Sequence, residues 1–110
     1  MTKTGVTAQE IAALYATIVA RKTADPADSY SAQLLADLPR AARKIGEEAS
    51  ETMVAALSGS DEELLAEAGD LFYHLLVVLV ARGLTLDQLT EVLAQRAGTS
   101  GIAEKAARDA

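Results

Sequence analysis

The 110-residue sequence has no cysteine and no tryptophan, and it has only two prolines, one phenylalanine and one histidine. The lack of cysteine excludes disulfide scaffolds, thiolate metal sites and thiol nucleophiles. Aromatic and β-branched residues, which favour strands, are scarce, whereas alanine and leucine, which favour helices, are abundant. The composition therefore excludes an all-β fold and predicts an all-α domain.

Positive charge is also in short supply, with 10 Lys and Arg against 16 Asp and Glu and a net charge of −6. Nucleic-acid binding is not expected, because phosphate backbones bind basic surfaces. Residues 1–6 lack the apolar core of a signal peptide, and the apolar stretch Leu71–Ala81 is shorter than the roughly 20 residues that span a bilayer. We expect one cytoplasmic domain over residues 1–110 with no membrane partner, a flexible N-terminus at 1–6 and a C-terminal tail at 99–110.

Helix start and stop signals divide the chain into about five helical segments. Capping boxes, in which a Ser or Thr is followed three residues later by Glu or Gln, begin at Thr7, Ser60 and Thr85. Pro39 suits a first helical turn, and glycines follow several of the apolar segments. The pattern predicts a helical bundle with helices over residues 7–22, 29–37, 39–57, 60–82 and 85–97.

Two acidic clusters lie on successive predicted helices. At about 100° per residue, Glu47, Glu48 and Glu51 share one face of the helix at 39–57 with Arg40 and Lys44. A face of this kind is usually apolar in a bundle helix.

The helix that follows carries Glu67, Asp70 and His74 on one face and is apolar on nearly every other side, which predicts that it is buried. We therefore expect Glu67 and Asp70 in or beside a core. A carboxylate in such a place needs a partner or a metal ion.

The short turn at residues 58–60 makes these two helices antiparallel neighbours. Their five carboxylates then face one another and form an oxygen-only site that suits Mg²⁺, with Mn²⁺ as a substitute. A solvated acidic face that binds a basic partner protein is the non-enzymatic alternative. A di-iron bundle is excluded on ligand count, because it uses two ExxH motifs and the chain has a single histidine.

The same residues carry a resemblance to a known family. Glu47-Glu48-Ala49-Ser50-Glu51, followed after fifteen residues by Glu67-Ala68-Gly69-Asp70, resembles the EExxE and ExxD signature of the all-α nucleotide pyrophosphohydrolases, the MazG-like superfamily. Further stretches resemble its phosphoribosyl-ATP pyrophosphohydrolase branch, which acts in histidine biosynthesis. These are the segments 14–22, 29–35, 43–49, 70–77 and 98–106.

The resemblance implies Mg²⁺-dependent hydrolysis of the α–β phosphoanhydride of 1-(5-phosphoribosyl)-ATP to phosphoribosyl-AMP and pyrophosphate. It implies Glu48, Glu51, Glu67 and Asp70 as metal ligands, with Glu47 as a further ligand or a residue that orients water, so that Glu47 and Glu51 are the catalytic candidates. Substrate contacts are expected from the cations and from one residue in each of two other predicted helices: Arg21, Lys22, Arg40, Lys44, Tyr30 and His74.

Alternatives remain open at this point. A house-cleaning pyrophosphohydrolase of ordinary nucleoside triphosphates has the same metal face and differs only in its contacts with base and ribose. His74 also fits a hydrogen-bonded core residue without a catalytic role, and Tyr73 fits packing. The apolar surface of the stretch 71–80 exceeds what one neighbouring helix covers, which predicts a homodimer.

Overall fold

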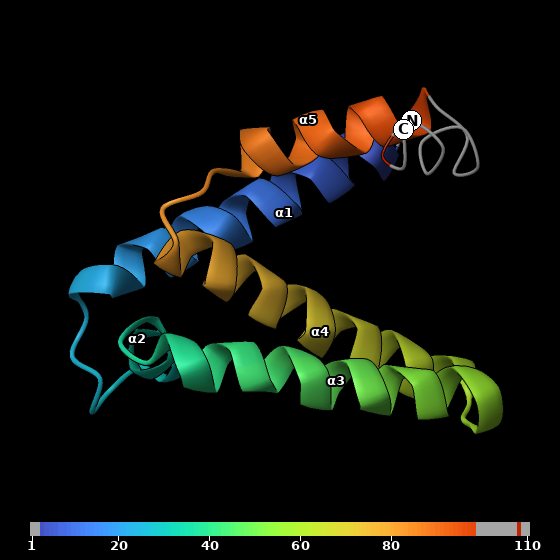
Figure 1. Ribbon diagram of the computed structural model, residues 1–110, viewed down its shortest axis with the longest axis horizontal. Helices are drawn as coiled ribbons and strands as arrows, with labels where there is room; N and C mark the ends of the chain where they lie inside the picture. The colour runs from blue at the N-terminus through green and yellow to red at the C-terminus, as the bar shows by residue number, and fades with distance from the viewer. Residues whose placement is uncertain (1–2, 99–107, 109–110) are drawn as a thin grey trace.

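The structure, a computed structural model, describes residues 3–98 and residue 108, and it is all-helical over that part of the chain (Figure 1). Five α-helices and one short 3₁₀ helix follow one another. Their bounds are α1 Lys3–Ala20, η1 Arg21–Thr23, α2 Tyr30–Leu35, α3 Leu38–Ser58, α4 Asp61–Ala81 and α5 Leu86–Ala97. The prediction of an all-α fold with about five helices is confirmed.

The central unit is an antiparallel hairpin of α3 and α4, two helices of 21 residues each. The Ser60 side chain accepts from the backbone N–H of Glu63, and Glu63 accepts from the backbone N–H of Ser60, both at 3.1 Å. A β-carbon at Gly59 would lie 3.0 Å from the Cα and O atoms of Ala55, so the turn requires a glycine at this close approach. In Figure 1 the hairpin diverges from α1 and α5, which form the other side of the molecule.

The core lies where α1, α2, α3 and α4 meet. Its buried members are Ile18, Leu34, Ala41, Leu76, Val77 and Val80. The α2 helix is capped by Ser29, whose side chain accepts from the backbone N–H of Ala32 at 3.1 Å. This packing anchors α2 beside one end of the hairpin and leaves the rest of the α3–α4 groove open to a site.

The predicted start of the first helix was wrong. Helix α1 begins at Lys3, before the predicted cap at Thr7, so residues 3–6 are helical and Thr7 lies inside the helix. The capping box did not set the boundary, because Gly5 upstream disfavours a helix by only about 1 kcal/mol and does not forbid it. Residues 1–2 and, except for Arg108, the predicted tail lie outside the described residues.

Helix α4 was predicted to be buried on nearly every side, and this was wrong for the single chain. His74, Leu76, Val77 and Val80 are buried, but Leu65 is 73% exposed. By length and composition alone, α4 is apolar enough to cross a membrane. It nevertheless has three acidic residues in its first turn and packs against α1, α2 and α3, as a core helix of a bundle does.

Candidate functional site

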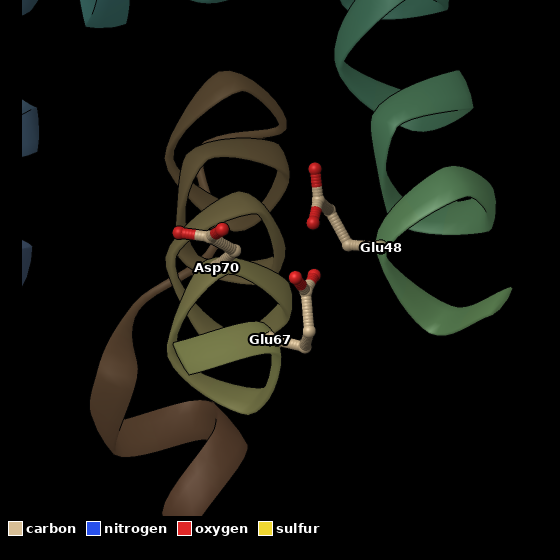
Figure 2. A group of neighbouring side chains, drawn as sticks. All are labelled: Glu48, Glu67 and Asp70. Carbon is tan, nitrogen blue, oxygen red and sulfur yellow. The ribbon is translucent and has the colours of Figure 1, made fainter. Parts of the chain in front are cut away.

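The α3–α4 hairpin brings three carboxylates together. One oxygen each from Glu48, Glu67 and Asp70 lies within 4.8 Å of the others. Figure 2 shows Glu48 reaching from α3 toward α4, where Glu67 and Asp70 are one turn apart. The two acidic clusters of the sequence thus meet in space, with one carboxylate from the first cluster and two from the second.

Burial is unequal among these three residues. Glu48 is only 6% exposed, whereas Glu67 is half-buried and Asp70 is exposed. Asp70 therefore lies beside the buried Glu48 and not in the core itself. The buried member is Glu48, on the side of α3 that packs against α4.

Two carboxylate oxygens in this group have no hydrogen-bond partner, Oε2 of Glu48 and Oε2 of Glu67, and both are buried. A buried polar atom without a partner destabilises a protein by about 1–3 kcal/mol, and more for a charged group. A bound cation removes this cost, because it supplies a positive partner to both oxygens. The residues therefore fit a hard divalent cation with oxygen ligands.

Glu51 lies beside this group, one turn after Glu48 on α3. Its interaction with Glu67, first by hydrogen bonding and then by charge repulsion, raises the pKa of the Glu51 carboxyl. A raised pKa is the expected sign of two carboxylates that share a small volume. Glu51 thus belongs to the same acidic site, although its own side chain is exposed.

Lys44 neutralises part of this charge. Its Nζ lies 3.3 Å from Oε2 of Glu47 and 3.4 Å from Oε1 of Glu48. The hydrogen bond with Glu47 is the main cause of a raised pKa of Lys44. The Glu47 carboxylate lies beside Lys44 and is not among the three convergent carboxylates, and 59% of its side chain is exposed.

A cavity of about 400 Å³ adjoins the acidic site on the side of the hairpin turn. Glu51 and Glu67 form its border with the carboxylate group, and Val54 and Ala55 give it an apolar floor. Its volume lies within the range of small-molecule sites. The site therefore has open space next to the carboxylates.

The opposite end of the site is closed by a network of hydrogen bonds around His74, which is 5% exposed. Its Nδ1 lies 2.7 Å from the backbone oxygen of Asp70, and its Nε2 lies 3.1 Å from the Tyr30 hydroxyl. Because a carbonyl oxygen only accepts, Nδ1 carries a proton and donates to Asp70. Both ring nitrogens of His74 thus have a hydrogen-bond partner, as expected of a satisfied core residue.

The remaining predicted contacts divide into two groups. Arg40 lies over the Tyr30 ring, with Cζ 5.7 Å from the ring centroid. Arg21 and Lys22 are exposed in η1, and Lys22 lines a different cavity, between η1 and α2. The structure brings Arg40 and Tyr30 to the His74 end of the site but does not bring Arg21 and Lys22 to the carboxylates.

Sequence reasoning missed the pairing of α2 with α4. Ser31 hydrogen-bonds the Tyr73 hydroxyl, and the rings of Tyr30 and Tyr73 stack with centroids 6.4 Å apart. The residues of this pairing are more than 40 positions apart along the chain. The only available signal was the presence of Tyr30, Tyr73 and His74 in a chain with few aromatic residues.

Comparison with known proteins identifies the family. Residues 11–97 match the family described as phosphoribosyl-ATP pyrophosphohydrolase. A phosphoribosyl-ATP pyrophosphatase of Erythrobacter litoralis (strain HTCC2594) is 58% identical over 96 residues, covering 86% of this chain and 92% of the relative. Proteins of the same name from Caulobacter vibrioides (strain NA1000 / CB15N) and Cereibacter sphaeroides (strain ATCC 17029 / ATH 2.4.9) are 54% and 53% identical; each covers 86% of this chain, and 89% and 93% of the relative. The chain that forms this acidic hairpin therefore belongs to the phosphoribosyl-ATP pyrophosphohydrolase family.

Proposed function

We propose that the chain hydrolyses the α–β phosphoanhydride of phosphoribosyl-ATP, in histidine biosynthesis, at a Mg²⁺ site formed by Glu48, Glu67 and Asp70 with Glu51 beside them. The reaction follows from family membership over residues 11–97. The observation that supports this location is the convergence of three carboxylate oxygens within 4.8 Å, with two buried carboxylate oxygens left without a partner.

Repulsion between the negative substrate and the carboxylates explains why this site needs a cation. A triphosphate is strongly negative, and the site itself presents at least four carboxylates, so direct contact between them is repulsive. Mg²⁺ held by these carboxylates would screen the phosphate oxygens and lower the pKa of a bound water molecule. Mn²⁺ has the same preference for oxygen ligands and is expected to substitute.

The protein residues have separate tasks in this proposal. Glu48, Glu67 and Asp70 hold the cation between two packed helices, which keeps their separation constant. Glu51 lies on the exposed side of the group, where its carboxylate can orient the attacking water and accept its proton. Glu47 holds Lys44 in place at 3.3 Å, and Lys44 in turn is within one turn of the carboxylates for contact with a phosphate oxygen.

The experiment measures pyrophosphate release from phosphoribosyl-ATP, ATP and the deoxynucleoside triphosphates, with Mg²⁺, with Mn²⁺ and with a chelator. We expect release from phosphoribosyl-ATP alone at a useful rate, and none with the chelator. A preference for plain nucleoside triphosphates would move the chain to the house-cleaning branch with the same metal face. Release that persists without a divalent cation would contradict the metal site.

The chain is further proposed to act as a cytoplasmic homodimer. Large apolar side chains are exposed at the hairpin turn, among them Leu57 at 87% and Leu65 at 73%. The radius of gyration is 16.1 Å, against about 13 Å for a compact domain of this length. A second copy that covers the exposed hairpin faces accounts for both features, and a monomeric mass by light scattering would exclude it.

A further inference from the structure

Arg40 has no anionic partner among the described residues of this acidic protein. No carboxylate in that part of the chain pairs with it, and the ion pairs of this region belong to Lys44. Its one side-chain hydrogen bond to a described residue runs from Nη1 to Oε1 of Gln33 at 3.4 Å, which is long. A guanidinium has five N–H donors, so most of the donors of Arg40 are available to a ligand.

The guanidinium is nevertheless held in position. It lies over the Tyr30 ring at 5.7 Å, a distance at which a cation is attracted to the face of the ring. The Tyr30 ring cannot shift freely, because its hydroxyl is hydrogen-bonded to Nε2 of His74 at 3.1 Å and its ring stacks on Tyr73. An arginine whose position is set before a ligand arrives loses less side-chain entropy on binding.

This arrangement is tied to the metal-binding helix. His74 donates from Nδ1 to the backbone oxygen of Asp70 at 2.7 Å, one turn from its own position on α4. The chain of contacts therefore runs from Asp70 through His74 and Tyr30 to Arg40. It fixes the guanidinium of Arg40, on α3, relative to Asp70, on α4.

The distance along α3 separates Arg40 from the metal ligands. Arg40 precedes Glu48 by eight residues, which is about 12 Å along the helix axis, and Lys44 lies midway between them. The α- and β-phosphates lie on either side of the bond that is cleaved, so in this proposal they lie at the carboxylates and Lys44. Arg40 is too far along α3 to share that position and suits a different anion on the same substrate.

Phosphoribosyl-ATP carries such an anion. A single phosphate outside the triphosphate terminates the phosphoribosyl arm. Two sugar rings and the purine separate it from the triphosphate, and plain ATP lacks it. We propose that Arg40 binds the single phosphate of this arm, with Tyr30 and His74 as positioning residues, and that this contact selects phosphoribosyl-ATP over ATP. The role of Arg40 rests on the proposed function, because only that substrate has the arm.

Binding of three compounds in the presence of Mg²⁺, measured by calorimetry, tests the proposal without turnover. The compounds are phosphoribosyl-AMP, AMP, which lacks the arm, and pyrophosphate. We expect the unmodified chain to bind phosphoribosyl-AMP at least tenfold more tightly than AMP. Arg40→Gln is expected to reduce this ratio to near one and to leave pyrophosphate binding unchanged, because the leaving group does not reach Arg40.

Two further variants separate positioning from direct binding. Tyr30→Phe keeps the ring under the guanidinium but removes the bond to His74, and it is expected to lower the ratio only a few-fold. Arg40→Lys keeps the charge and is expected to recover part of the ratio that Arg40→Gln loses. The matched control is Arg43→Gln, an exposed arginine on the same helix, for which no change is expected.

Several results would overturn the proposal. The first is equal binding of phosphoribosyl-AMP and AMP by the unmodified chain. The second is an equal loss of pyrophosphate and phosphoribosyl-AMP binding in Arg40→Gln, which would place Arg40 at the leaving group. If Arg40→Gln melts at a lower temperature, the Arg40→Lys variant is used in its place. Equal binding of phosphoribosyl-AMP and AMP by this folded, positively charged variant would contradict selection by charge. Failure of the proposed function is distinguishable from failure of the Arg40 proposal. In the first case the unmodified chain releases no pyrophosphate from phosphoribosyl-ATP.

Discussion

Replacing Glu48 with glutamine is expected to give a protein that is more stable than the unmodified chain without Mg²⁺ and less stable than it with Mg²⁺. Without metal, the change removes a buried negative charge whose Oε2 has no partner, and it places an amide donor near the unpartnered Oε2 of Glu67. Relief of an unsatisfied buried group is worth about 1–3 kcal/mol. Loss of the ion pair with Lys44, which is partly exposed, costs about 0–1 kcal/mol. The metal-free variant is therefore expected to be more stable by about 1 kcal/mol.

Mg²⁺ is expected to make the unmodified chain the more stable of the two proteins. A cation that binds only the native state at one hundred times its Kd stabilises the unmodified chain by about 2.7 kcal/mol. For a domain of this size each kcal/mol raises the Tm by about 4–8 °C, so the rise is roughly 10–20 °C. Glu48→Gln loses one of the three convergent ligands and is expected to gain little.

Thermal melts at matched ionic strength, with Mg²⁺ or with a chelator, measure both quantities. The control is Glu62→Gln, which removes the same charge from an exposed position on α4 and leaves the metal response intact. Equal stabilisation of Glu48→Gln and the unmodified chain by Mg²⁺ would refute the assignment of Glu48 as a ligand. A metal-free variant that is less stable than the unmodified chain would refute the strain attributed to the buried carboxylates.

Other expectations concern single residues. Glu51→Gln should lower turnover of phosphoribosyl-ATP by orders of magnitude without loss of metal-free stability, since it relieves repulsion with a neighbouring carboxylate; normal turnover would exclude a catalytic role. The backbone N–H of the α4 N-cap lowers the pKa of Glu63, so its charge stabilises the fold above the ordinary glutamate pKa of about 4.3 and this contribution is lost as pH falls through the lowered value. Urea unfolding of Glu63→Gln should thus show a deficit in stability at pH 7 that shrinks as the pH falls below the ordinary glutamate pKa. Gly59→Ala should destabilise by about 1–3 kcal/mol because of overlap with the backbone of Ala55, whereas Gly46→Ala, with open space around it, should stabilise by about 0.5–1 kcal/mol.

Local signals in the sequence were sufficient for the hairpin and for the identity of its carboxylates. The capping box at Ser60 and the acidic spacing on each helix depend on neighbours within a turn or two, which a linear pattern contains. The relative burial of Glu48 and Asp70 was not predictable, because it depends on the rotation of α3 and α4 about their axes when they pack. The start of α1 was also missed, since a good cap at Thr7 does not prevent a helix from extending upstream.

The contacts of Arg40 and Tyr30 could not be predicted from the sequence. They require α2 to pack on α4, and this depends on the buried Leu34 and on hydrogen bonds that join residues more than 40 positions apart. No periodicity in the sequence contains that information. The spacing predicted which residues share a helix face but not which faces meet.

The turn between α3 and α4 has a consequence for how the chain folds. Glu48, Glu67 and Asp70 lie within 23 consecutive residues, so closing one short loop brings them together before α1 or α5 has docked. Loops of this size close at a small entropic cost and on a submicrosecond timescale. The carboxylates thus repel one another early in folding, and a divalent cation is expected to raise the folding rate more than it slows unfolding. Stopped-flow refolding with and without Mg²⁺ reads this order of events directly.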